Sequence, residues 1–456
     1  MASFVSLVSK LGSVGIGFGV TVLIARRFGA AGSGLWALGA TFLAITSTVS
    51  LCGLDYATTR MIAVYRAAEQ WSAVRGWTRT GLVILGAVGS VATITAWVER
   101  APIAALLGAP GDLDRILQTL SLAIVPACLL RLLGGLLRGL RRFAVAEIIE
   151  GSIVPASLAV LAFTVGLQGL GQIAEVYVGA TFAAATFGLA VWFYILGDRG
   201  RPAGPMMFRS ALSSSLPMAG TVLALLASPW ILTIALARFS GPAEVGIFRV
   251  AMQFMLLMGM LLNATDTALS PQMAALHSQN KLKELLFATK NMTLLMIVLG
   301  GAPALILVIF AKEFLSILGP EFPRGAPAMQ ILILGQMVNL MAGPNGSFMI
   351  MTGMEKLSFR NALVGLIVVV VASALLIPRY GMVGAATAWA CATIYRNLGL
   401  TAIIWRLHGL FLPLGIARSQ TLPMKAPTSG EPFEVVPVAM RDPEDQAEPP
   451  GPTSAA

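Results

Sequence analysis

Long apolar segments recur along the whole chain and restrict its fold more than any other feature. A helix needs about 20 mostly apolar residues to cross a bilayer. Charged residues make up only 11% of the sequence, whereas soluble domains carry about 25%. The sequence therefore predicts an all-α polytopic membrane protein with about twelve transmembrane helices. The predicted segments are residues 3–25, 35–54, 80–97, 116–137, 148–168, 174–196, 211–237, 246–270, 291–310, 327–352, 361–378 and 382–405.

One motif occurs in both halves of the chain. The stretch Ile24–Phe42 is matched by Leu236–Phe254. The recurring residues are Arg26, Gly29 and Gly34 in the first copy and Arg238, Gly241 and Gly246 in the second. We expect the arginines to mark the ends of the first and seventh helices and the glycines to permit a tight turn into the next helix. Because repeated halves of transporters rock against each other around a site between them, two pseudo-symmetric six-helix bundles are predicted.

The predicted bundles are residues 1–196 and 211–406, joined by a cytoplasmic linker over 197–210. Residues 407–456 are rich in Pro, Ser and Glu without apolar periodicity, and this composition predicts a disordered tail. Fifteen Lys and Arg residues fall in the even-numbered loops and eight in the odd-numbered ones. Since positive residues stay on the cytoplasmic side, the even loops and both termini are predicted to be cytoplasmic.

Polar side chains follow one face of the first two helices of each half. Residues at three- or four-residue spacing share a helix face, so these stripes are expected to line one water-filled cavity. The alternative, that small polar residues only pack helices together, stays open for the Ser and Thr positions. The stripes are Ser6, Lys10, Ser13 and Gly17; Thr41, Thr48, Cys52, Asp55 and Thr59, with Arg60 beside them; Ser210, Ser214, Pro217, Thr221 and Ser228; and Arg249, Gln253, Met260, Asn263, Thr267 and Ser270, with Asp266 adjacent.

The cations in these stripes point to an anionic ligand. A cation near the membrane interior costs roughly 2.5–3.5 kcal/mol, so Lys10 and Arg249 need a reason. They could instead snorkel to the nearer interface. The chain before the tail carries 28 basic and 15 acidic residues, which favours a ligand such as a diphosphate, because Arg presents a planar fork to phosphate. Arg131 and Arg396 are further candidates.

The acidic residues of the stripes leave two readings open. Asp55 with Arg60, and Asp266 with Arg249 or Lys10, could form structural ion pairs. The same two carboxylates are also the acids best placed for ion coupling.

Prolines predict irregular helices, because Pro217, Pro229, Pro271 and Pro344 can each bend or end a helix. Pro217 is a candidate hinge in the seventh helix, since proline removes a backbone donor. Pro344, between Gly343 and Asn345, predicts a break in the tenth helix. Such breaks occur where backbone is buried in protein or lines a cavity.

Four motifs in this order resemble the polysaccharide flippases of the multidrug/oligosaccharidyl-lipid/polysaccharide exporter superfamily. They are Ala25–Gly34, Gly53–Arg60, Val245–Gln272 and Leu376–Ala386. The resemblance spans residues 1 to 405 and implies a V of two six-helix bundles around a cationic cavity, working by alternating access. It implies translocation of undecaprenyl-diphosphate-linked oligosaccharide across the bacterial inner membrane for surface polysaccharide biosynthesis.

By helix and depth, the resemblance places basic cavity residues at Lys10, Arg60 and Arg249, and the stripe adds Gln253 and Asn263. The expected partners are the lipid-linked oligosaccharide, membrane lipids, and a polysaccharide polymerase with glycosyltransferases. No catalytic residue, metal, cofactor or nucleic acid is predicted.

Three other functions compete with the flippase. A cation-coupled drug exporter of the same fold predicts a cavity dominated by acids and aromatics, which the stripes lack. A membrane polysaccharide polymerase or ligase predicts a long external loop, and all loops here are short. A membrane scaffold would not need Lys10 and Arg249 in the membrane.

Overall fold

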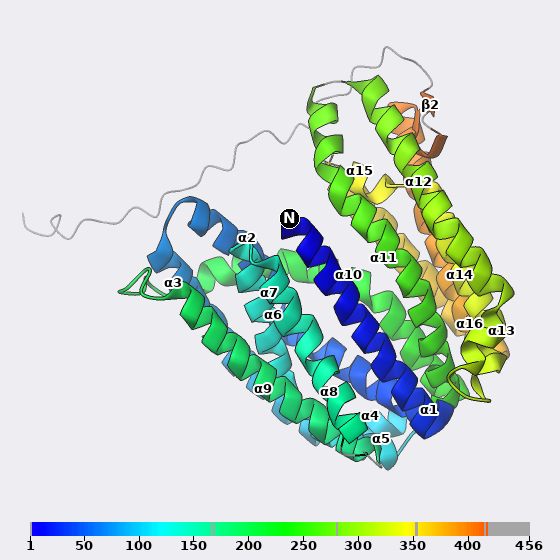
Figure 1. The fold of residues 1–456 in the computed structure, drawn as a ribbon, viewed down its shortest axis with the longest axis horizontal. Helices are drawn as coiled ribbons and strands as arrows, with labels where there is room; N and C mark the ends of the chain where they lie inside the picture. Colours follow the sequence, from blue (N-terminus) through cyan, green and yellow to red (C-terminus); the bar gives the residue numbers. More distant parts are fainter. Residues whose placement is uncertain are drawn as a thin grey trace, which may run out of the picture.

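The computed structural model describes residues 2–164, 166, 169–279, 281–351, 354–414 and 416–417. Within these ranges, the side chains of residues 2–11, 260–275 and several single helical positions fall outside the description. The described residues are almost all helical, and the helices are arranged as two arms that meet at one end and diverge toward the other (Figure 1).

The first half contains α1 to α9. Their bounds are α1 Ala2–Leu51, α2 Leu54–Ala67, α3 Trp71–Val98, α4 Arg100–Leu106, α5 Asp112–Ser121, α6 Ile124–Gly139, α7 Phe143–Glu147, the π-turn η1 Ile148–Ser152, α8 Ile153–Thr164 and α9 Leu170–Leu196. The second half contains α10 to α16. Their bounds are α10 Phe208–Ser240, α11 Pro242–Ser278, α12 Leu282–Ile309, α13 Ala311–Ser316, the 3₁₀ turn η2 Phe322–Gly325, α14 Ala326–Ala342, α15 Asn345–Met351 and α16 Glu355–His408. A short hairpin of β1 Leu410–Phe411 and β2 Ile416–Ala417, with the 3₁₀ turn η3 Leu412–Leu414 between them, follows.

The predicted transmembrane segments coincide with helices. Seven described helices are long and apolar enough to cross a bilayer, or nine when two bent pairs each count as one span. Two of these helices, α1 and α16, each consist of two helices joined at a glycine with positive φ, Gly29 (φ 67°) and Gly381 (φ 52°). Dividing them there and adding the 37-residue α11 gives the twelve predicted spans among the described residues, so the predicted fold class is confirmed.

The glycine turns of the repeat motif are confirmed at two of four positions. Gly29 (φ 67°, ψ −167°) and Gly241 (φ 86°, ψ 171°) adopt nearly the same conformation, each between the first and second helix of its half. Left-handed φ is strained for other residues, which explains the glycine. Gly34 and Gly246 lie inside helices instead, so the prediction that they form turns is wrong.

Helix irregularities follow from prolines. The seventh predicted segment, α10, bends by 48° between Phe208–Ala224 and Leu226–Ser240. Pro229 has no N–H to offer the carbonyl four residues earlier, and that carbonyl belongs to Leu225, at the bend. The bend of this conformation therefore lies at Pro229, one of the prolines predicted to bend a helix, and the hinge predicted at Pro217 stays a prediction. The predicted break in the tenth helix is confirmed, because α14 ends at Ala342, Gly343 has φ 70°, and α15 begins at Asn345.

The two largest hydrophobic cores of the described residues organise the arms. One lies in the first half, joined by Ala211 at the start of α10, and contains the fully buried Trp77 and Trp192. The other joins the halves where the arms meet, with Ala30 and Leu38 of α1 in one cluster with Phe248 of α11. The halves therefore share a core at the end where the arms meet. Toward the other end the start of α10 packs against the first half, where the Met207 N–H donates to the Thr80 hydroxyl at 2.8 Å.

Candidate functional site: the cleft between the two arms

Two polar contacts fasten the halves together at the closed end. The Arg26 Nε donates to the Ile317 carbonyl at 2.7 Å, and the Ala30 N–H donates to Glu321 Oε2 at 2.8 Å. Ala30 begins the second part of α1, so Glu321 satisfies a free amide at a helix N-terminus, where a negative charge is favoured. Arg26 therefore has a structural role in this conformation. Its repeat counterpart Arg238 is exposed in the last turn of α10.

The other two repeat glycines mark the crossing point of the halves. A Cβ on Gly34 would lie 1.7 Å from the Pro242 carbonyl oxygen, and a Cβ on Gly246 would lie 2.1 Å from the Ala30 carbonyl oxygen. Only glycine permits this approach of two backbones. The repeat motif thus forms the contact about which α1 and α11 cross.

This crossing defines which side of α11 faces the first half, because Gly246 lies against α1. At 100° per residue, Arg249 and Gln253 lie within about 60° of Gly246, the residue that touches α1. Arg249 is exposed although its neighbours Phe248 and Val250 are buried, and Gln253 is half-buried. The geometry favours a cation that faces the space between the arms over one that snorkels to the nearer membrane interface.

Arg249 also breaks the symmetry between the repeats. With Gly246 aligned to Gly34, its counterpart in the first half is Ala37, which is buried. Among the described residues, no carboxylate lies within ion-pair distance of Arg249. One arm therefore carries a cation toward the cleft that the packing of the repeat does not require.

Asp55 does not pair with Arg60. Its Oδ2 lies 2.7 Å from the Arg131 Nη2, and the Arg131 Nη1 donates to the Thr48 hydroxyl at 2.6 Å. Asp55 Oδ1 also accepts the Tyr56 N–H in the first turn of α2. The predicted Asp55–Arg60 pair is thus corrected, and Arg131 compensates the one described carboxylate of the polar stripes.

A second ion pair lies deeper in the first arm. Arg138 Nη1 approaches Glu150 Oε2 at 2.6 Å, and the hydroxyls of Ser13 and Ser152 lie 2.6 Å apart. Glu150 and Ser152 belong to the π-turn η1, which precedes Pro155. A π-turn at this place is consistent with the helix donor that proline removes.

We predict that Arg131→Gln destabilises the protein. It leaves the Asp55 carboxylate, which is 5% exposed, without its partner, and breaking a buried pair costs about 3–5 kcal/mol. Thermal unfolding in detergent measures the effect, with the exposed Arg115→Gln as control. Adding Asp55→Asn to Arg131→Gln should recover part of the loss. Equal melting temperatures for Arg131→Gln and Arg115→Gln would show that the pair contributes nothing.

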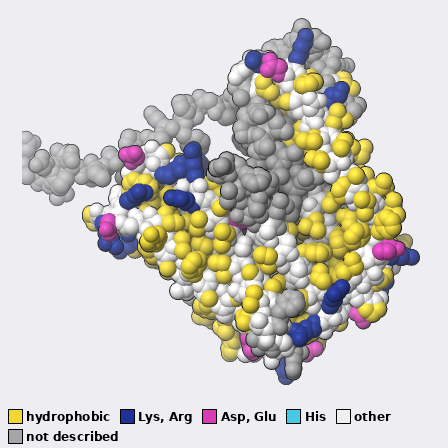
Figure 2. All heavy atoms as spheres, viewed as in Figure 1, with side chains coloured by type: hydrophobic (Ala, Val, Ile, Leu, Met, Phe, Trp, Pro, Cys, Tyr) yellow, Lys and Arg dark blue, Asp and Glu magenta, His cyan; other side chains and the backbone are white. Residues whose placement is uncertain are grey.

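The remaining predicted residues are distributed as follows. Arg60 is exposed on α2 at the diverging end, where Lys and Arg side chains gather near α2 and α3 (Figure 2). The side chains of Lys10, Asn263 and Asp266 lie outside the described residues. Within the described part of the chain, no group of His, Cys, Asp and Glu could hold a metal ion.

Sequence reasoning missed Glu321 and the partner of Asp55. Glu321 lies in a loop without periodicity, and only the fold brings it to Ala30. Arg131 could have been paired with Asp55 by the rule that an ionisable residue in a membrane helix seeks an opposite charge. The helix that supplies that charge is not visible in the sequence.

The fold and the apolar helices define a multi-pass membrane protein built from two repeated halves. The family model for "Polysaccharide biosynthesis protein" matches residues 2–277, and the MatE model matches residues 217–375. The chain belongs to the polysaccharide biosynthesis protein family.

Individual proteins resemble the chain more distantly. The capsular polysaccharide biosynthesis protein CapF of Staphylococcus aureus is 26% identical over 183 residues, a match that spans 40% of this chain and 43% of CapF. An inward-facing multidrug resistance MATE family transporter of the MOP superfamily superimposes with a TM-score of 0.69 at 16% identity, covering 87% of this chain and 96% of that one. The lipid II flippase MurJ in an inward closed conformation gives 0.67 at 13% identity, with 88% and 87% covered. At these identities the structural matches establish the fold alone.

Proposed function

We propose that the protein is a flippase that moves a polyprenyl-diphosphate-linked oligosaccharide, undecaprenyl-linked in a bacterial cell, across the inner membrane for surface polysaccharide biosynthesis. The diphosphate and glycan pass through the cleft while the lipid tail stays in the bilayer. A polymerase and glycosyltransferases are the partners that would use and supply this cargo.

The observation that carries the proposal is Arg249. It is an exposed cation on the cleft face of α11, with no described acidic partner and no counterpart in the other half. A guanidinium offers two parallel N–H donors to a phosphate. A diphosphate would supply the charge that the protein does not, and Gln253, one turn further along, would add a neutral donor.

Orientation follows from charge. The diverging end carries the even-numbered loops, in which Lys and Arg are concentrated, so we place this end and both termini in the cytoplasm. The described conformation then opens inward, and the contacts of Arg26 and Glu321 close the outer end. The full cycle would break these contacts and close the cytoplasmic end instead.

A cation-coupled exporter of small molecules is the second candidate. The match to the MatE model and the MATE transporter fold favour it. Coupling requires a carboxylate that can exchange its cation. Of the two predicted coupling residues, Asp55 is held by Arg131 and Asp266 lies outside the described residues, so the described carboxylates give this candidate less support than Arg249 gives the flippase.

Reconstituted vesicles distinguish the two. We expect purified protein to expose a fluorescent undecaprenyl-diphosphate saccharide to an impermeant quencher faster than protein-free vesicles do. A matched probe with neutral undecaprenol should not respond. Sodium- or proton-driven efflux of a cationic dye, without translocation of the diphosphate probe, would replace the flippase by the exporter.

A further inference from the structure

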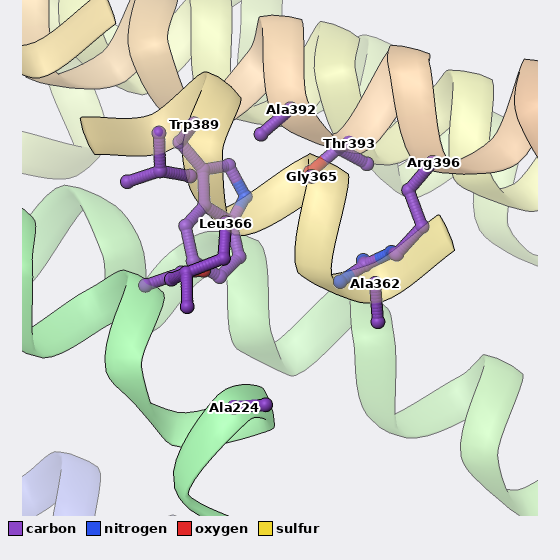
Figure 3. Close-up of a pocket in the computed structure, with 10 residues that line it drawn as sticks. Ala224, Ala362, Gly365, Leu366, Trp389, Ala392, Thr393 and Arg396 are labelled. Carbon is purple, nitrogen blue, oxygen red and sulfur yellow. The ribbon is translucent and has the colours of Figure 1, made fainter. Parts of the chain in front are cut away.

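A second polar pocket lies inside the second half, apart from the crossing of α1 and α11. It is enclosed by α10 and by both parts of α16 (Figure 3). Ala224 and Ser228 border the bend in α10, so the pocket forms where that helix changes direction. The lining residues are Ala224, Ser228, Ala362, Gly365, Leu366, Val369, Trp389, Ala392, Thr393 and Arg396.

The polar groups of this pocket can all donate hydrogen bonds. Arg396 is half-buried and extends toward Ala362, with the Trp389 indole across the same space (Figure 3). The Trp389 Nε1 is buried and has no hydrogen-bond partner in the described structure. Thr393 and Ser228 add hydroxyls. No acidic residue lines the pocket, and no described carboxylate pairs with Arg396.

A hydrogen bond holds the main chain at Arg396, whereas no described hydrogen bond or ion pair holds its guanidinium. Asn361 Nδ2 donates to the Arg396 carbonyl at 2.8 Å, which ties the two parts of α16 together. One turn after Asn361, a Cβ built on Gly365 would lie 3.9 Å from the Arg396 Cβ. The guanidinium is thus held at the pocket by its main chain rather than by a salt bridge.

The two nitrogen donors, the Trp389 Nε1 and the Arg396 guanidinium, have no described acceptor, and the Ser228 and Thr393 hydroxyls, which can accept as well as donate, carry no negative charge. A buried donor without a partner costs about 1–3 kcal/mol, and more when it is charged. Arg keeps its charge in proteins, so neutralisation by proton loss does not resolve the deficit. A neutral polar molecule would satisfy the indole but not the charge, whereas an anion satisfies both.

We propose that this pocket binds one compact anion, a halide or a single phosphate group, between the Arg396 guanidinium and the Trp389 N–H. The small side chains of Ala224, Ala362 and Ala392 leave room for a group of this size and exclude a sugar. The site lies within one arm, so the proposal does not depend on what passes through the cleft. Because it touches the bend in α10, the anion would also join that helix to α16.

Anion titration of purified protein in phosphatidylcholine nanodiscs tests the proposal. Chloride or inorganic phosphate replaces gluconate at constant ionic strength, and tryptophan fluorescence is the readout. A third titration uses nanodiscs with phosphatidylglycerol, which distinguishes a lipid phosphate from a free anion. We expect a saturable fluorescence change in at least one titration. This change should be lost in Trp389→Phe, and the apparent anion affinity should fall at least tenfold in Arg396→Gln. The control Arg406→Gln, exposed further along α16, should titrate like the wild type.

Two results would overturn the proposal. One is that no titration gives a saturable fluorescence change for wild-type protein that elutes as a single folded species. The other is an unchanged midpoint in Arg396→Gln. If Arg396→Gln does not fold, Arg396→Lys keeps the charge without the fork and should still shift the midpoint. A failure here leaves the flippase assay unaffected, because that assay follows the lipid probe in the cleft.

Discussion

Replacing Arg249 by alanine is expected to lower translocation of a diphosphate-linked saccharide by about 100-fold, with the protein still folded in the membrane. The guanidinium would make two charge-assisted hydrogen bonds to phosphate, each contributing about 1.5 kcal/mol or more, and 1.4 kcal/mol corresponds to a factor of ten. The Arg249 side chain is exposed, so its removal should not alter the melting temperature. The rate of probe exposure in vesicles measures the effect, and loss of surface polysaccharide reports it in cells.

Two variants separate the guanidinium from charge in general. Arg249→Lys keeps the charge but offers no planar fork, so an intermediate loss, about tenfold, is expected. Arg115→Ala removes an exposed arginine of α5, outside the cleft, and should transport at the wild-type rate. Wild-type translocation by folded Arg249→Ala would rule out Arg249 as the phosphate ligand, and the main support for the flippase would be lost.

Features set by local chemistry were predictable from the sequence. Apolar length gave the transmembrane segments, since a bilayer accepts few other solutions. Gly29 and Gly241 were predicted as turns because glycine adopts left-handed φ without strain, although the same argument failed at Gly34 and Gly246, whose smallness serves a close helix contact instead. The break beside Pro344 was visible for the same kind of reason, with two glycines and a missing donor in one stretch.

Features set by tertiary contacts were not predictable. The partner of Asp55 is Arg131 on another helix, whereas sequence proximity suggested Arg60. Both Pro217 and Pro229 were predicted to bend α10, and the bend lies at Pro229. Which proline bends a helix depends on how neighbours compensate each freed carbonyl. The pocket at Arg396 lies where α10 bends against α16, and neither the bend nor this contact between helices can be read from the sequence.

The contact between Gly34 and Gly246 leads to the other large prediction, since in the proposed alternating-access cycle it would make the repeat motif part of the gate. A Cβ at either position would meet backbone of the opposite helix at 1.7 or 2.1 Å, and backbone cannot move aside as a flexible side chain can. Overpacking costs typically 1–3 kcal/mol, partly offset by the better helix propensity of alanine, up to about 1 kcal/mol. Both Gly34→Ala and Gly246→Ala should therefore destabilise the closed outer end.

This penalty applies only while α1 and α11 cross closely, so an alternating-access protein can escape it by opening the outer end. Spin labels at Arg115 and Lys312, which are exposed on opposite halves of that end, report its opening. We expect double electron–electron resonance to show longer distances between them in Gly246→Ala than in the wild type. Gly179→Ala is the control, because a Cβ there meets nothing within 4 Å. If Gly246→Ala matches this control in both melting temperature and distance distribution, the crossing is not a gate, and the repeated glycines have no role in the transport cycle.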